Sequence, residues 1–295
     1  MKLFDWRLRD IPVVTYWDLQ RIVSAASKKV ELSFQSSQGT RIRVIPEERL
    51  VCFNEVRMSL YEIVELYLGL KKREHEAECK TLYCIVDGSL RKLMLSSSNK
   101  QYKVCKAREE WAPTLIVNGI VMHTLRRDPL EDARDKAVYV KRGARVLDTC
   151  ACFGYTTRAC LERGASYVLA TEIDENVLEL STYNIYSSAL GSSRVDLVNE
   201  SILDVTPLLR DSSFDAVIHD PPRLMSETGD LYSEELYREF YRLLGRGGVL
   251  FHYTGATGSK YRGVNVQRGV IKRLRNVGFQ IVRCVEGFGV YAVKP

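Results

Sequence analysis

The chain has 295 residues, of which 45% are hydrophobic and 27% are charged, and its formal net charge at pH 7 is +6, an ordinary composition for a globular protein with ample material for a core. No segment approaches the roughly 20 apolar residues needed to cross a bilayer, and residues 1–7 lack the apolar core of a signal peptide. We therefore expect a cytoplasmic protein without a membrane partner.

Residues 1–127 are expected to form a smaller α+β domain. Apolar positions at helical spacing predict helices over 17–27 and 60–70, whereas period-two alternation and turn residues predict strands around them. The pair Asn118-Gly119 is the strongest short hairpin signal in the chain. The expected strands span residues 30–34, 41–45, 81–86, 91–95, 101–106, 113–117 and 120–124.

A second domain is expected over residues 128–295, beginning at a capped helix with Pro129 in its first turn. From there strands and helices alternate, which predicts an α/β fold with a doubly wound, mostly parallel, seven-stranded sheet covered on both faces. The last two strands have no helix between them, so we expect one antiparallel strand at the end. The expected strands are 146–147, 167–171, 195–198, 216–218, 249–253, 280–285 and 289–293, and the later helices are 175–188, 233–244 and 266–277.

The eight cysteines are scattered through a large chain without export signals, so reduced thiols are expected rather than disulfides. The pair Cys79 and Cys84 and the pair Cys150 and Cys152 lack companion Cys or His pairs at zinc-finger spacing. We therefore expect no metal site, and we interpret these cysteines as small buried hydrophobic residues.

Two runs of the sequence, residues 89–106 and 240–285, contain basic residues and no acidic ones. Clustered charge of one sign attracts polyanions, although a solvated surface can have the same composition. Two such runs in one chain favour RNA or DNA as a partner. Their basic residues are Arg91, Lys92, Lys100, Lys103, Lys106, Arg242, Arg246, Lys260, Arg262, Arg268, Lys272, Arg273, Arg275 and Arg283.

The first strand of the second domain leads into a turn of small residues, from Asp148 to Gly154, and then into a helix. Glu172 follows at the end of the next strand, where an acid can accept hydrogen bonds from two ribose hydroxyls. This pair fits NAD or S-adenosylmethionine. Cys150 and Cys152 stand where a dinucleotide-binding turn has glycines for the close approach of a pyrophosphate, so the second cofactor is favoured. Taken alone, Asp148 could instead be a helix N-cap.

The order Asp148-x-Cys150-x-Cys152-x-Gly154, Glu172 and Asp220-Pro221-Pro222 resembles class I S-adenosylmethionine-dependent methyltransferases, over roughly residues 140–295. The resemblance implies the class I methyltransferase fold and S-adenosyl-L-methionine as the cofactor. In that family the loop after the first strand wraps the methionine part, the acid after the second strand binds the ribose, and nearby residues contact adenine. The residues that the resemblance assigns to the cofactor are Asp148, Thr149, Cys150, Ala151, Gly154, Tyr155, Thr156, Glu172, Ile173, Glu200 and Ser201.

Within this family, Asp220-Pro221-Pro222 resembles the signature of amino methyltransferases, which act on exocyclic nitrogens of adenine, cytosine or guanine, or on a glutamine amide. The lone pair of such a conjugated amine is drawn away from the nitrogen, which makes the amine a poor nucleophile. The Asp220 carboxylate and the Pro221 carbonyl could each accept one N–H bond and localise the lone pair toward the methyl group. Two prolines hold the backbone rigid and leave no N–H in the way. The alternative is that these three residues only turn the chain.

The residues around this signature are candidates for binding the substrate. Arg223 stands where the signature has an aromatic residue, and a guanidinium can stack on a base or bind phosphate. Tyr232 follows a polar stretch that we expect to form a lid over the substrate entrance. His123, His219 and His252 lie at or near strand ends and are further candidates, with a structural role as the alternative. No cysteine follows the prolines, which disfavours carbon-5 methylation through a covalent adduct.

The wider pattern, including Phe251 to Gly255, resembles a group of archaeal predicted methyltransferases that we associate with N4 methylation of cytosine in ribosomal RNA. We therefore predict an RNA base N-methyltransferase whose N-terminal domain and basic runs position the RNA, since a base must be splayed out to reach a buried carboxylate. The alternatives are an aminopropyltransferase of the spermidine-synthase type, a methyltransferase of a protein glutamine or a small molecule, and a non-catalytic RNA-binding module. The loop at Asp220 lacks the acidic character of a polyamine site, and its intact signature argues against a decayed fold.

Overall fold

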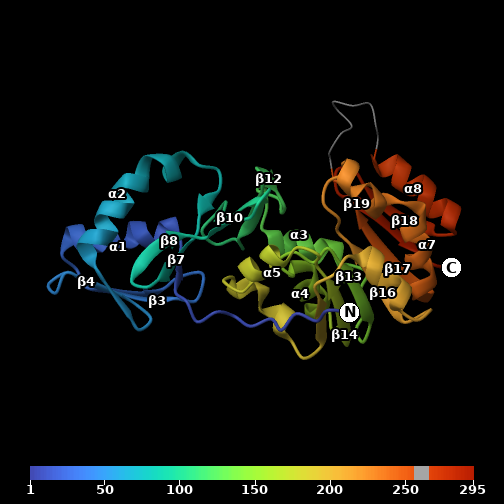
Figure 1. Ribbon diagram of the computed structural model, residues 1–295, viewed down its shortest axis with the longest axis horizontal. Helices are drawn as coiled ribbons and strands as arrows, with labels where there is room; N and C mark the ends of the chain where they lie inside the picture. Colours follow the sequence, from blue (N-terminus) through green and yellow to red (C-terminus); the bar gives the residue numbers. More distant parts are fainter. Residues whose placement is uncertain (256–265) are drawn as a thin grey trace. The chain divides into compact units, whose positions relative to one another are not determined.

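The computed structural model describes residues 1–255 and 266–295, so Lys260 and Arg262 of the second basic run lie outside the described residues. The chain divides into two compact units (Figure 1). Residues 8–129 and 179–186 make up the N-terminal unit, and residues 1–7, 130–178 and 187–295 make up the C-terminal unit. Residues 1–7 thus belong to the C-terminal unit and residues 179–186 to the N-terminal unit. The expected single boundary after residue 127 does not describe these two exchanges.

The described part of the N-terminal unit combines two helices with three small antiparallel sheets. Strands β2 to β5 form one sheet, β1, β7 and β8 a second, and β6 with β9 to β12 a third. The predicted hairpin at Asn118-Gly119 is confirmed, because β11 pairs antiparallel with β12. The strands are β1 Val13–Val14, β2 Leu32–Gln35, β3 Arg41–Ile45, β4 Leu50–Phe53, β5 Val56–Ser59, β6 Lys80–Thr81, β7 Tyr83–Val86, β8 Ser89–Lys92, β9 Met94–Ser96, β10 Gln101–Lys106, β11 Thr114–Val117 and β12 Ile120–Val121.

Helix α1 (Tyr16–Lys28) begins at a capping box, in which the side chains of Thr15 and Asp18 each accept a hydrogen bond from the other's backbone N–H. Such a cap stabilises a helix by about 1 kcal/mol. Leu19 and Ile22 on one face of the helix are fully buried in a core shared with β3 and β4. Because each such side chain contributes about 1.5–3 kcal/mol on burial, this apolar face holds the helix against the sheet.

Three features of this unit differ from the expectations. Helix α2 (Leu60–Glu76) continues past residue 70, because the buried carboxylate of Glu74 accepts hydrogen bonds from the backbone N–H and the hydroxyl of Thr81, which anchors the last turns. Strands β4 and β5 were not predicted, since the all-apolar run of β4 shows no alternation. Cys79 and Cys105 form a disulfide, which corrects the expectation of reduced thiols. The pairing of β6 with β10 brings these distant positions together.

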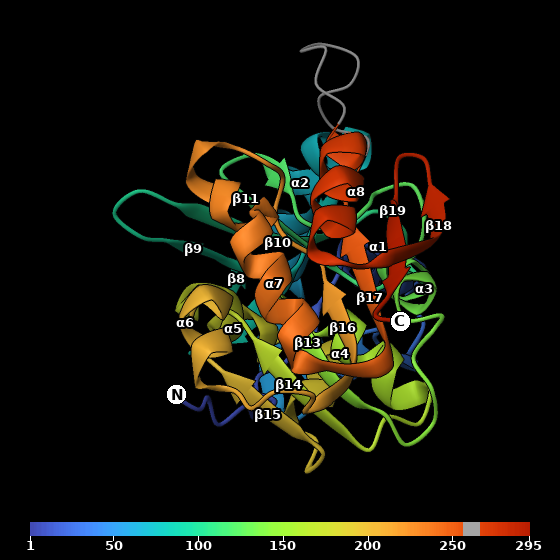
Figure 2. The same cartoon turned by 90° about the vertical axis from the view of Figure 1, so that its right-hand side faces the viewer.

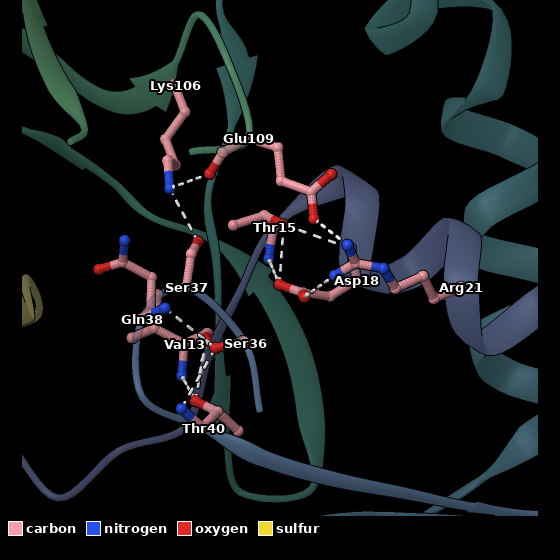
Figure 3. A network of polar contacts seen from close by, with 10 residues as sticks. All are labelled: Val13, Thr15, Asp18, Arg21, Ser36, Ser37, Gln38, Thr40, Lys106 and Glu109. Carbon is pink, nitrogen blue, oxygen red and sulfur yellow. Dashed lines mark hydrogen bonds and ion pairs between the residues drawn. The ribbon is translucent and has the colours of Figure 1, made fainter. Parts of the chain in front are cut away.

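A buried polar network in this unit joins α1, the loop after β2 and the end of β10 (Figure 3). The ammonium of Lys106 is fully buried and donates hydrogen bonds to the Ser37 hydroxyl at 2.8 Å and to the Glu109 carbonyl at 2.7 Å. Since both partners are neutral oxygens, they offset only part of the cost of burying the charge. Burial accordingly lowers the pKa of Lys106 to about 8. The charged form of this lysine therefore destabilises the unit.

The C-terminal unit is organised around a mixed sheet of seven strands, in the order β15-β14-β13-β16-β17-β19-β18 within the described ranges. The neighbours from β15 to β17 pair in parallel, and both pairs that involve β19 are antiparallel. The α/β class and the antiparallel closing strand are therefore confirmed. The strands are β13 Arg145–Thr149, β14 Tyr167–Thr171, β15 Val195–Val198, β16 Phe214–His219, β17 Leu244–Tyr253, β18 Gln280–Val285 and β19 Gly289–Val293.

Helices α7 and α8 lie alongside each other in this unit (Figure 2) and pack on one face of the sheet. Phe240 of α7 and Leu274 of α8 are fully buried in the same core as Leu147 of β13. No helix within the described ranges is long and apolar enough to span a membrane. The helices are α3 Pro129–Lys136, α4 Tyr155–Glu162, α5 Glu175–Ser181, α6 Ile202–Val205, α7 Glu234–Leu243 and α8 Val266–Val277, and the 3-10 helices are η1 Ile185–Gly191, η2 Thr206–Leu208 and η3 Ser226–Tyr232.

Helix α5 ends at Ser181, well before the predicted end at residue 188. The hydroxyl of Thr182 donates to the Glu179 carbonyl at 2.6 Å, which gives the backbone a local alternative to the helical ladder. A 3-10 helix, η1, takes the place of the last predicted turns. At the edge of the C-terminal sheet, Leu3 forms an antiparallel bridge with Val198, so the first residues of the chain extend the sheet beyond β15.

Candidate cofactor and catalytic site

Strands β13 and β16 are neighbours in the sheet, although the chain forms β14 and β15 between them. Open α/β sheets bind their ligands at such a point, outside the carboxyl ends of the strands where the strand order reverses. Asp148 is the next-to-last residue of β13, and Asp220 directly follows β16. The structure thus brings the two predicted motifs to the same edge of the sheet, at its switch point.

The loop after β13 contains three residues with a left-handed backbone, Cys150, Cys152 and Gly154, with φ of 57°, 50° and 70°. Glycine adopts this conformation freely, whereas a residue with a side chain is strained by about 1–3 kcal/mol. The N–H of Ala151 donates to the last carbonyl of β14 at 2.8 Å, and the N–H of Cys152 donates to the Glu172 carboxylate at 2.9 Å. These bonds hold the cysteines in the conformation of the glycines that they replace. Desolvation raises the pKa of both thiols, so they stay neutral.

The side chain of Asp148 is fully buried. Its Oδ2 accepts hydrogen bonds from the hydroxyls of Thr156 at 2.8 Å and Thr157 at 2.6 Å, while its Oδ1 has no hydrogen-bond partner among the described residues. Burial raises the pKa of Asp148 to about 7, against the lowering effect of the two hydroxyls. Asp148 is not the N-cap of α4, because that position is occupied by Gly154. Its second oxygen is therefore available to a hydrogen-bond donor of a ligand.

Glu172 directly follows β14 and fastens the loop. Its Oε2 accepts the N–H of Cys152 at 2.9 Å, and its Oε1 accepts the N–H of Asp174 at 3.0 Å. The predicted contact of this carboxylate with two ribose hydroxyls stays a prediction. The sequence pattern located this acid at the strand end, but its hold on the loop depends on the tertiary structure.

The predicted adenine-side residues follow β14 and β15. Ile173 is 68% exposed, so its side chain can contact a flat apolar ligand. Ser201 serves as the N-cap of α6, and Glu200 accepts a hydrogen bond at 2.7 Å from a backbone N–H near the start of the chain. Asn199, which no motif marked, donates to the carbonyl of Glu172 at 2.9 Å and to that of Ile173 at 3.1 Å, and so fixes this turn.

The carboxylate of Asp220 is held by a lysine that no sequence motif marked. Lys136, the last residue of α3, donates to Oδ2 of Asp220 at 2.6 Å and to Oδ2 of Asp132 at 2.9 Å. The lysine is only 7% exposed, and its ammonium lies 4.6 Å from the centre of the Tyr253 ring. Burial raises the pKa of Asp220, and the adjacent lysine lowers it. The sequence signal was limited to the i, i+4 spacing of Asp132 and Lys136, which is common on helix surfaces.

The residues after Asp220 differ in their surroundings. Pro221 is buried and Pro222 is exposed, and the carbonyl of Pro222 accepts a hydrogen bond from the Tyr232 hydroxyl at 2.9 Å. The stretch predicted as a lid forms the 3-10 helix η3, and Tyr232 at its end is a buried member of the core. Tyr232 therefore supports the proline segment from the core, which differs from the expectation that it binds the substrate beside a lid. The side chain of Arg223 is exposed.

The three histidines that the sequence offered as substrate-binding candidates are held by contacts within the protein. His219 and His252 are fully buried, and their ring centroids lie 4.6 Å apart. His219 bonds through Nε2 to a backbone carbonyl, so its Nδ1 accepts from the hydroxyl of Thr149 at 2.5 Å. Burial lowers the pKa of His219 to about 4 and that of His252 well below its usual range, so both are neutral at pH 7. His123 belongs to the N-terminal unit, where its Nδ1 lies 3.2 Å from the Thr114 hydroxyl.

Residues 147–252 match a family model described as a methyltransferase domain. The protein MJ1233 of Methanocaldococcus jannaschii, described as uncharacterized, is 45% identical over 280 residues, which cover 94% of this chain and 93% of that protein. The ribosomal RNA large subunit methyltransferase I of Aeromonas hydrophila is 29% identical over 135 residues, 42% of this chain and 33% of that protein. A solved structure of spermidine synthase from Thermotoga maritima superposes with a TM-score of 0.54 at 16% identity, over 73% of this chain and 75% of that one. At that identity the likeness concerns the fold alone.

The methyltransferase domain implies S-adenosyl-L-methionine as the cofactor, and the residues at this edge of the sheet fit such a ligand. The buried Oδ1 of Asp148 offers an acceptor to a polar or charged donor. The carboxylate of Glu172 lies beside the loop, and the exposed Ile173 offers an apolar surface to a flat ring. The loop between Asp148 and Glu172 has a left-handed backbone at Cys150, Cys152 and Gly154.

Proposed function

The chain belongs to the family of MJ1233 and contains a class I methyltransferase domain, and from this premise we propose that it transfers a methyl group from S-adenosyl-L-methionine to an exocyclic amino nitrogen of a nucleobase in RNA. The candidate target is N4 of a cytosine in ribosomal RNA. The proposal also includes the prediction that the sheet has the doubly wound, mostly parallel arrangement of class I methyltransferases. The observation that carries it is a lysine-bound carboxylate, Asp220, which precedes two prolines at the switch point of the sheet.

Asp220 and Pro221 are suited to activating a conjugated amine. The bound cofactor supplies an electrophilic methyl group. With Oδ2 of Asp220 engaged by Lys136, Oδ1 of the carboxylate accepts one N–H of the amine, and the Pro221 carbonyl accepts the other. These two acceptors localise the lone pair on the nitrogen. The hydrogen bond from Tyr232 to the Pro222 carbonyl keeps the segment in one orientation, so little reorganisation is needed during the reaction.

Exposed basic residues support RNA as the partner. Arg268, Lys272 and Arg275 are exposed on α8 at spacings of three and four residues, so they share one helix face. The sequence has no acidic residue from position 240 to position 285. The relatives in Aeromonas hydrophila and Photobacterium profundum are both named as ribosomal RNA methyltransferases, although each matches only 42% of this chain. We further propose that the N-terminal unit, with its own basic run at residues 89–106, helps to position the RNA.

An aminopropyltransferase of the spermidine-synthase type is the second candidate, because spermidine synthases share the fold. A polyamine carries several positive charges and needs several uncompensated acids around it. Beside Asp220, the second carboxylate of the cluster, Asp132, shares the ammonium of Lys136 at 2.9 Å. With one ammonium between two carboxylates, the cluster keeps a single surplus negative charge, fewer than the several uncompensated acids that a polyamine needs, which favours a neutral amine as the substrate.

The proposal is tested by incubating the protein with tritiated S-adenosyl-L-methionine and, separately, RNA from cells that lack this protein, a protein extract, or polyamines. We expect label in RNA, in a nucleoside methylated on its amino group. The absence of label from RNA refutes the proposal, and label in protein or a small molecule identifies a methyltransferase with another substrate. Transfer to a polyamine from labelled decarboxylated S-adenosylmethionine identifies the aminopropyltransferase.

Replacement of the carboxylate tests its role directly. We expect Asp220→Ala to reduce transfer by about 10²–10⁴-fold, because the amine loses one of its two acceptors. The affinity for S-adenosyl-L-methionine, measured by calorimetry, is expected to change little, because Asp148 and Glu172 remain. An equal loss of transfer and of cofactor affinity contradicts the assigned role.

A further inference from the structure

Lys136 occupies the space between α3 and the ends of β16 and β17. Its ammonium donates to Asp220 at 2.6 Å and to Asp132 at 2.9 Å, and it lies 4.6 Å from the centre of the Tyr253 ring. The side chain is 7% exposed, so water is largely excluded. An ammonium has three N–H donors and no acceptor, and here two carboxylates accept hydrogen bonds from it while an aromatic ring lies beside it.

This arrangement is more than a helix-surface ion pair. Burying an ammonium is costly, and a structural role at the end of α3 would be met by Asp132 alone at i, i+4 spacing. Instead the side chain turns inward to a carboxylate 84 positions away in the sequence, at the carboxyl edge of the sheet. The contact engages one oxygen of Asp220 and leaves the other to a ligand.

We propose that Lys136 is the positioning residue of Asp220: it fixes Oδ2, keeps the carboxylate ionised, and thereby presents Oδ1 to the substrate amine. The inference rests on the proposed function, in which Asp220 accepts an N–H of that amine. A protonated carboxyl has lost acceptor capacity and would compete as a donor, so the ionised form is required for this role.

The electrostatic surroundings of Asp220 support this assignment. Burial favours the protonated form of Asp220, and Asp132 does so as well, so Lys136 is the neighbour that opposes both. In turn, the two carboxylates raise the pKa of Lys136, against the lowering effect of burial. The groups that face Asp220 are Lys136 and Asp132 from α3, Asp148, Cys150 and Cys152 from β13 and its loop, Tyr232 from η3, and Tyr253 from β17.

Two substitutions on α3 are expected to act in opposite directions. Lys136→Met removes the opposing charge, so we expect the pKa of Asp220 to rise by one unit or more. The acidic limb of the pH profile of kcat/KM then moves up by the same amount, and kcat/KM falls roughly tenfold at pH values below the limb. Asp132→Asn removes a like charge, so the same limb moves down. Lys136→Arg keeps the charge and is expected to restore the limb to near its original pH. Lys141→Met removes an exposed lysine from the same unit and serves as the matched control.

The pKa of Asp220 is also measured without turnover, by the 13C titration of aspartate-labelled protein in which the Asp220 signal is assigned by its loss in Asp220→Asn. An unmoved Asp220 titration in Lys136→Met, or in Asp132→Asn if the first variant does not fold, overturns the inference. If the titration moves as expected but RNA receives no methyl group, the proposed function fails while the coupling of the two residues stands. If RNA is methylated with an unmoved pH limb in both variants, Lys136 has only a structural role.

Discussion

Replacement of Asp148 by asparagine tests whether the buried carboxylate at the start of the loop from Asp148 to Gly154 lowers the free energy of unfolding of the protein. Burial raises the pKa of Asp148 in the folded protein from 3.8 to about 7. Between these values the folded state keeps a proton that the unfolded chain has released, so the free energy of unfolding falls as the pH rises through this range and stays lower above it. At about 1.36 kcal/mol per pKa unit, the shift corresponds to a cost of about 4 kcal/mol above pH 7.

Asp148→Asn removes this cost and keeps an amide oxygen that can accept the hydroxyls of Thr156 and Thr157. We expect the variant to be more stable than the unsubstituted protein at pH 8, by up to about 4 kcal/mol, with the difference shrinking toward pH 4. We also expect weaker binding of S-adenosyl-L-methionine, because an NH₂ group replaces the oxygen that has no partner among the described residues. Such a gain of stability with a loss of binding is typical of functional sites.

The measurement is denaturant unfolding of both proteins at several pH values between 4 and 8, with cofactor affinity determined by calorimetry. Asp204→Asn, at an exposed position of α6, is the matched control and is expected to leave both quantities nearly unchanged. If the unfolding free energies of Asp148→Asn and the unsubstituted protein change in parallel over this range, the carboxylate does not lower stability and the reasoning is refuted.

Two further predictions concern single residues. Gly154→Ala places a Cβ 2.5 Å from the side chain of Leu190 at a φ of +70°, so we expect a loss of about 1–3 kcal/mol in unfolding free energy together with weaker cofactor binding, and an unchanged denaturation midpoint would contradict this. Lys106 has a pKa of about 8 in the folded protein, below its usual 10.5. Between these pH values the unfolded chain still binds a proton that the folded protein has released, so we expect the free energy of unfolding to rise by about 3 kcal/mol from pH 8 to pH 10.5. Unfolding of Lys106→Met over the same range should lack this rise, and an identical pH slope in both proteins would show that the buried ammonium is not its cause.

Local patterns in the sequence were sufficient for the class of the fold and for the position of the two motifs. Helices and strands repeat their apolar positions with different periods, so α8 was predicted from the sequence with its observed bounds. Acids at the ends of parallel strands meet at one edge of a sheet, which is why Asp148, Glu172 and Asp220 could be expected together. The positive φ of Cys150 and Cys152 was not predicted, although the sequence showed that these residues stand where a dinucleotide-binding turn has glycines.

Where the expectations were wrong or incomplete, the deciding contacts were ones that hydrophobic periodicity does not show, whether near or distant in the sequence. The disulfide of Cys79 and Cys105 depends on the pairing of β6 with β10, and Tyr232 is buried by its packing in the core. Helix α5 ended early because the hydroxyl of Thr182 competes with the helical ladder, which propensity alone did not weigh.

The sequence by itself thus determined most of the helices and strands, the position of the loop from Asp148 to Gly154 and the acids at the strand ends, because these follow from periodicity and turn chemistry within short stretches. Only the tertiary structure decided which oxygens of those acids are engaged. Lys136 contacts Asp220 across 84 positions, and its alignment results from packing α3 against the ends of β16 and β17. The protonation state of a buried carboxylate depends on such neighbours and on its burial, and neither quantity is encoded in local spacing.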